Sequence, residues 1–62
     1  MEKPACKLVG TDGNVFSIIG RVSRALKRAG QLNKAQEFCQ RAMSSASYDD
    51  VLALTFEYVE VE

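Results

Sequence analysis

Histidine and tryptophan are absent from this sequence of 62 residues, which has one proline and two cysteines. The side chain that proteins use most often as a general base and as a metal ligand is therefore missing. Cys6 and Cys39 lie far apart, and no CxxC pair supplies the ligand spacing of a zinc site. The carboxylates of Asp49 and Asp50 are explained by their place at the start of a predicted helix. We expect no metal, no cofactor and no enzymatic activity.

Long apolar runs are also lacking, and no segment approaches the roughly 20 residues that a membrane-spanning helix needs. The opening residues, MEKPACK, are not followed by an apolar region of signal-peptide length. We expect a cytoplasmic protein with no membrane segment. The reducing environment of the cytosol would keep both cysteines as thiols, packed like small apolar groups.

What is present is an ordinary globular composition, with 47% hydrophobic and 26% charged residues. A chain of this length makes a single domain, residues 1–62, near the lower limit for an apolar core without disulfides or metal. Each large apolar residue is therefore treated as a core residue before any binding role is considered for it. The net charge is zero, but the charged residues are unevenly distributed along the chain. Residues 1–46 hold all eight Lys and Arg with three acids, whereas residues 47–62 hold five acids and no base.

Apolar residues recur every three or four positions after residue 14, which predicts an amphipathic helix from Asn14 to Ala29. Asn14 or Asp12 is expected to cap its start, and Gly30 to provide the left-handed residue after its end. Gly20 lies inside this helix at a cost of up to about 1 kcal/mol relative to alanine, and we expect it to allow close approach of another backbone. The predicted core-facing stripe is Val15, Ile18, Ile19, Val22, Leu26 and Ala29.

A second helix is predicted after Asn33, which with Gln36 has the spacing of a capping box. The residues that follow continue the helical period of apolar positions. Its inward positions are Ala35, Phe38, Cys39, Ala42, Met43 and Ala46.

A third helix is predicted from Ser47 to about Tyr58, because Ser47 and Asp50 repeat the capping spacing. Its acidic side, which includes Glu57, is expected to face solvent. Its inward side is expected to carry Tyr48, Val51, Leu52, Thr55, Phe56, Tyr58 and Val59.

The two ends of the chain have the pattern of short strands. Residues Ala5 to Val9 alternate in character after Pro4, and the tail at residues 59–62 reads VEVE. We expect these segments to pair in a small two-stranded sheet beside the three helices. The predicted fold class is α+β and mostly helical.

Two glycines flank an acidic position in the segment LVGTDGNVF, residues 8–16. A phosphate-binding P-loop is excluded, because its lysine is missing and its spacing is wrong. The spacing resembles the GXXG loop of KH domains, but too few residues precede Gly10 for the helix that such domains place there, and Asp12 would repel phosphate. A turn that starts the first helix explains Gly10 and Gly13 better.

The first helix carries a run of bases without an acid, RVSRALKR. Arg21, Arg24 and Arg28 fall on one side with Lys27 beside them, a pattern that suits the phosphates of a nucleic-acid backbone. The acidic C-terminal segment could equally lie across this face, and the sequence leaves both interpretations open.

A helix-turn-helix would use the second helix to read DNA. The short break at residues 30–32 fits that motif, but Leu26 stands where the motif usually has alanine. Its reading residues would be Lys34, Gln36, Gln40 and Arg41.

Three aromatic residues of the third helix, Tyr48, Phe56 and Tyr58, are the other candidate surface. Tyrosine suits interfaces because its ring is apolar and its hydroxyl polar. In so small a domain the same rings are also core candidates.

From Lys7 to Glu62 the chain resembles a family of short uncharacterised proteins encoded on conjugative transposons, plasmids and phages of clostridia and related Gram-positive bacteria. The segments that carry the resemblance are KLVGTDGNVFSIIGRVSRALKRAG and YDDVLALTFEYVEVE. The resemblance implies a mobile-element origin and supplies no activity and no site residues.

Two hypotheses follow. The first is a small interaction module that binds another protein or itself. The sequence predicts a complete set of helices and strands, and no group of residues suited to catalysis accompanies them. The second is a nucleic-acid-binding protein that uses Arg21, Arg24, Lys27 and Arg28.

Overall fold

The computed structural model describes residues 3–8 and 14–62, which form three helices between two short strands. The expected fold class, α+β and mostly helical, is confirmed. The elements follow in the order β1 (Ala5–Cys6), α1 (Val15–Arg28), α2 (Leu32–Met43), α3 (Tyr48–Tyr58) and β2 (Glu60–Val61).

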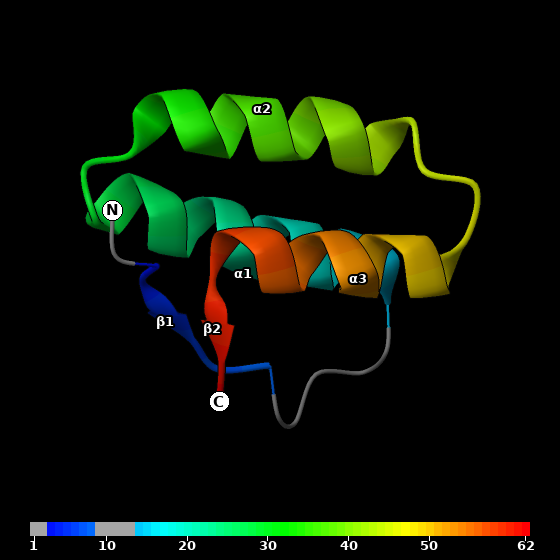
Figure 1. Ribbon diagram of the computed structural model, residues 1–62, viewed down its shortest axis with the longest axis horizontal. Coiled ribbons are helices and arrows are strands. Elements are labelled where there is room, and N and C mark those ends of the chain that lie inside the picture. Colours follow the sequence, from blue (N-terminus) through cyan, green and yellow to red (C-terminus); the bar gives the residue numbers. More distant parts are fainter. Residues whose placement is uncertain (1–2, 9–13) are drawn as a thin grey trace.

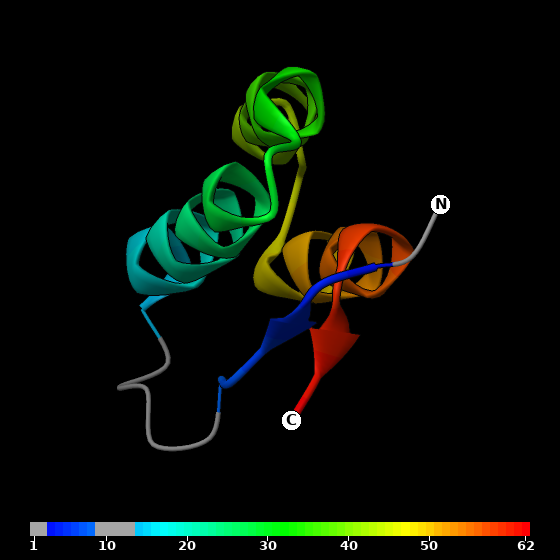
Figure 2. The same cartoon turned by 90° about the vertical axis from the view of Figure 1, so that its left-hand side faces the viewer.

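The three helices lie side by side, and the strands cover the side away from α2 (Figure 1). α2 runs opposite in direction to α1 and α3, as the short connections between consecutive helices require. Viewed along the helices, α2 lies at the top, with α1 and α3 below it on either side (Figure 2). Each helix therefore contacts both of the others, and the sheet lies beneath α1 and α3.

The strands β1 and β2 pair in parallel, with Ala5 opposite Glu60 and Cys6 opposite Val61. The amide of Glu60 donates to the carbonyl of Pro4, and the amide of Glu62 donates to that of Cys6, both at 2.9 Å. Parallel pairing needs a long crossover connection, and here all three helices form it. The expected pairing of the chain ends is confirmed. The first strand is shorter than predicted, and Val9 lies outside the described residues.

The core takes side chains from every helix and from both ends of the chain. Phe38, Val22 and Leu26 are completely buried. Cys6 is buried and Cys39 partly buried against the core, so the expectation that both pack as small apolar groups is confirmed. The remaining buried apolar residues are Ile18, Ala35, Ala42, Val51, Leu54, Tyr58 and Val59.

Both predicted ends of α1 are confirmed. The side-chain oxygen of Asn14 accepts a hydrogen bond from the amide of Phe16 at 2.8 Å, which caps the start. At the other end Gly30 has a φ of 78°. The amide of Gln31 donates to the carbonyl of Leu26 at 2.9 Å, and that of Gly30 to Lys27 at 3.0 Å, which is the Schellman arrangement.

The predicted start of α2 is wrong, whereas that of α3 is correct. α2 begins at Leu32 after Gln31, with no side-chain capping bond, so Asn33 lies inside the first turn. The Schellman turn explains the early start, because it delivers the chain directly into α2, where the carbonyl of Gln31 accepts from Ala35. In α3 the Ser47 hydroxyl accepts from the amide of Asp50 at 3.2 Å, as predicted.

The buried side of α3 differs from the predicted one. Leu54 is buried, although the predicted inward face omits it, whereas Tyr48 and Phe56 are exposed. Thr55 is completely buried, and its hydroxyl donates to the carbonyl of Val51 at 2.9 Å. Because this bond satisfies the hydroxyl within the helix, a polar residue can occupy a core position.

The segment with Gly10, Asp12 and Gly13 lies in residues 9–13, outside the described part of the chain. The predicted turn at these glycines, and the alternative cap at Asp12, therefore stay predictions.

Gly20 does not mark a close backbone approach, so that expectation is wrong. The residue is exposed, and a β-carbon built on it meets no atom within 4 Å. Since an exposed glycine inside a helix costs conformational entropy, Gly20→Ala should raise the free energy of unfolding by up to about 1 kcal/mol. Gly30→Ala should lower it by about 1 kcal/mol, because the left-handed backbone at φ 78° disfavours a β-carbon.

Urea unfolding of the two variants measures both changes. The substitutions add the same methyl group, so each is the control for the other. A decrease in both variants would contradict the assignment of Gly20 to an unobstructed helix position, and an increase in both would contradict the left-handed backbone at Gly30.

Candidate functional site

The predicted basic residues of α1, Arg21, Arg24, Lys27 and Arg28, are all exposed. Three of them, Arg21, Arg24 and Arg28, line one shallow hollow of about 210 Å³ where α1 passes β1. We call this the arginine hollow. Its other lining residues are Ala5, Cys6, Lys7 and Ala25, so Lys27 does not line it.

Contacts with the N-terminal strand orient the arginine hollow. The Nη1 of Arg21 donates to the carbonyl of Lys7, the residue directly after β1, in a long hydrogen bond of 3.4 Å. Burial raises the pKa of the Cys6 thiol above its usual value, the positive charge of Arg21 opposes this rise, and the negative charge of Glu62 adds to it. The thiol is therefore protonated at neutral pH and is a poor nucleophile.

The acidic residues of α3 and the C-terminal tail do not pair with these arginines. Within residues 3–8 and 14–62, the ion pairs are Lys34 with Glu37 at 3.7 Å and Arg41 with Glu57 at 3.3 Å. Neither involves a base of α1. The arginine hollow therefore presents its positive charge to solvent.

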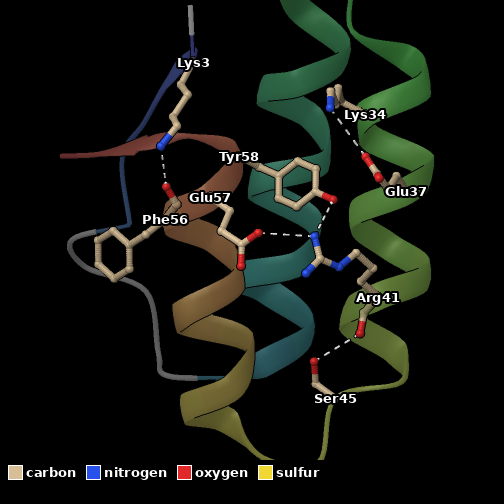
Figure 3. Close-up of polar contacts among 8 residues, drawn as sticks. All are labelled: Lys3, Lys34, Glu37, Arg41, Ser45, Phe56, Glu57 and Tyr58. Atoms are coloured by element: carbon tan, nitrogen blue, oxygen red, sulfur yellow. Dashed lines mark hydrogen bonds and ion pairs between the residues drawn. The ribbon is translucent and has the colours of Figure 1, made fainter.

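Tyr58 belongs to the core and joins α2 to α3, so the candidate aromatic surface is divided. Its ring meets Phe38 edge-on, with centroids 5.4 Å apart and planes at 68°. Arg41 lies over the same ring, 5.7 Å from its centroid, and donates from Nη1 to the Tyr58 hydroxyl at 3.0 Å (Figure 3). This bond is the main cause of a raised pKa at Arg41. Tyr58 is thus not available to a partner.

A second hollow, of about 270 Å³, has Tyr58 in its lining together with five charged residues, Lys3, Lys34, Glu37, Arg41 and Glu57, but these charged groups already have partners. Besides the two ion pairs, the ammonium of Lys3 donates to the carbonyl of Phe56 at 2.9 Å. This contact places a cation at the end of α3, whose last turn has no base of its own. Lys34 pairs with Glu37, and Arg41 binds Glu57 and Tyr58. These contacts argue against a role for the two residues in reading DNA.

An apolar groove, which sequence reasoning did not find, lies where the start of α1 meets the connection between α2 and α3. Phe16, Met43 and Tyr48 stand around it with 67%, 69% and 40% of their surface exposed. Its volume is about 460 Å³. Its remaining lining residues are Val15, Ile19, Ala42, Ser45, Ala46, Ser47 and Val51.

Phe56 is also exposed, at 58%, but it does not line the groove. Its ring points away from Tyr58 in Figure 3. The three aromatic residues predicted as one surface therefore have three different environments: Tyr48 lines the groove, Tyr58 is in the core, and Phe56 is exposed elsewhere on α3.

The side chains of the described residues contain no cluster of three or more Cys, Asp or Glu that could hold a metal ion. Among the helices of the same part of the chain, none is both long and apolar enough to cross a membrane.

The fold and its surfaces define a small, mostly helical α+β domain in which two parallel strands join the chain ends. Comparison of the chain with models of protein families, with curated proteins and with solved structures finds no match. The function must therefore be argued from the surfaces themselves.

The two cysteines should differ in reactivity in the native state. Cys39 is partly exposed on α2, whereas Cys6 is buried and its pKa is raised. We expect Ellman's reagent at mildly alkaline pH to modify Cys39 first and Cys6 in a slower phase, since only the thiolate attacks. Stopped-flow absorbance resolves the phases, and Cys39→Ser should remove the faster one. Loss of the slower phase instead would contradict the burial of Cys6.

Proposed function

We propose that the protein is a small non-catalytic interaction module that binds a segment of another protein in the apolar groove. The observation that supports this proposal is the gathering of Phe16, Met43 and Tyr48, all exposed, around one groove. Scattered apolar residues are normal on protein surfaces, but contiguous ones mark binding sites.

The size of the groove favours a short segment over a second copy of the chain. Ten of the described residues line it, whereas a stable protein–protein interface uses roughly 20–30 residues on each side. A single amphipathic helix needs a smaller surface, because a few apolar anchors at helical spacing supply most of its binding. The proposed occupant is therefore an amphipathic helix of a partner protein.

Charge near the groove defines the occupant further. Within the described part of the chain no basic residue lines the groove, and the first turn of α3, next to Tyr48, carries the exposed acids Asp49 and Asp50. Opposite charges at the rim of an interface favour encounter and orientation. The segment that binds here should carry basic residues beside its apolar anchors.

The resemblance to proteins of mobile genetic elements suggests where the protein acts. The protein would act in the cytoplasm of a Gram-positive bacterium as an accessory of such an element. Its partner would be a protein of the element or of the host, and binding requires no cofactor, metal or catalysis.

Selection from a displayed library of helical peptides tests the groove. The peptides that the wild-type protein selects should share apolar residues at positions i, i+3 or i+4, and i+7, with Lys or Arg beside them. Phe16→Ser and Met43→Ser should each weaken binding of these peptides about tenfold or more, since burying such a side chain contributes about 1.5–3 kcal/mol. Isothermal titration calorimetry measures the loss.

The matched control is Phe56→Ser, which also removes an exposed phenyl ring but lies outside the groove. It should leave peptide affinity unchanged. Equal losses in the control, or selected peptides with acids beside their anchors, would count against the proposal. A dimer in light scattering that Met43→Ser dissociates would show that a second copy occupies the groove.

A further inference from the structure

We propose that the arginine hollow binds the phosphate backbone of duplex DNA without reading its sequence. This surface is separate from the apolar groove, and the inference does not depend on the proposed protein partner. The inference rests on three observations about Arg21, Arg24 and Arg28. These are their spacing along α1, the lack of an ion pair between them and any acid of the described residues, and the side chains that line the hollow with them.

The spacing of the arginines matches an extended anionic ligand. Arg21, Arg24 and Arg28 follow the i, i+3, i+7 pattern, so they share one side of α1. At a rise of 1.5 Å per residue, the first and last are about 10 Å apart along the helix. Guanidinium groups bind phosphate through paired N–H donors. Three along one line can hold neighbouring phosphates of a strand.

The arginines have little competition for this role from the protein itself. Among residues 3–8 and 14–62, no acid lines the hollow, and the two ion pairs use Lys34 and Arg41 of α2. Glu62 acts on Cys6 at the floor of the hollow, but less strongly than Arg21 does. Lys7 in the lining adds positive charge, and so does the exposed Lys27 on the same helix as the arginines. The local field is therefore positive although the whole chain is neutral.

The other lining residues explain why only the backbone would be bound. Proteins that bind single strands add aromatic rings on which bases stack, and neither Phe16, Tyr48 nor Phe56 lines the hollow. Readout of base edges uses side chains such as Asn and Gln beside Arg, and the neutral lining residues here are Ala5, Cys6 and Ala25. A rigid row of phosphates, as in a duplex, suits such a surface best.

Fluorescence anisotropy with a short labelled DNA duplex tests the inference. Binding should be detectable at low salt, equal for duplexes of unrelated sequence, and weaker for single strands. Three phosphate contacts predict that log K falls against log salt with a slope of about −3. Arg24→Gln and Arg28→Gln should each reduce the magnitude of that slope by about 1.

Lys34→Gln is the matched control, since it removes one exposed positive charge that pairs with Glu37 on α2. It should leave the slope unchanged, and circular dichroism should show that all three variants remain folded. Met43→Ser, which alters the groove, should bind DNA like the wild type. The Met43→Ser variant therefore distinguishes a failure of the proposed peptide binding in the groove from a failure of the proposed DNA binding in the arginine hollow.

Four outcomes would overturn the inference. These are no binding at low salt, tighter binding of single strands than of the duplex, equal effects of Lys34→Gln and Arg24→Gln, and displacement of the duplex by polyglutamate at matched charge. The last would assign the arginine hollow to an acidic protein surface.

Discussion

The mutual burial of three short apolar stripes is the constraint on which the whole structure depends. No helix here is long enough to be stable by itself in water, so each needs the other two. Phe38 of α2 and Leu26 of α1 are completely buried, and Tyr58 of α3 meets Phe38 edge-on. Cys6 and Val59 extend this core to the chain ends, where the paired strands close the side that the helices leave open.

This constraint also decides which residues remain for binding. Most of the larger apolar side chains of the helices are buried or packed against the core, so the exposed ones at the helix ends are the candidates for binding. Phe16 lies in the first turn of α1 and Met43 ends α2, and both remain exposed beside Tyr48 at the start of α3. The later part of α1 presents Arg21, Arg24 and Arg28 instead. One helix thus contributes to two surfaces of opposite chemistry, which supports the view of this domain as a binding module.

Polar contacts at the other end of the helices have a structural role. Arg41 joins Tyr58 and Glu57 across the boundary between α2 and α3, and Lys3 supplies a cation to the end of α3. The charged groups among them, Lys3, Arg41 and Glu57, are exposed, so each contributes little to stability on its own. Together they set the position of the last turn of α3, from which the chain enters β2. The charges that could be mistaken for a ligand site are therefore used in holding elements together.

The sequence by itself determined the three helices, three of the residues at their ends and the strand pattern of the two chain ends, because these depend on local hydrogen bonds and on the periodicity of apolar residues. Asn14, Gly30 and Ser47 act on amides and carbonyls within a few residues, so neighbours in the chain suffice to predict them. The tertiary structure alone decided what each face meets. Gly20 faces solvent, Tyr58 is buried while Phe56 is exposed, and residues from three helices form the groove, since these outcomes depend on how distant segments pack.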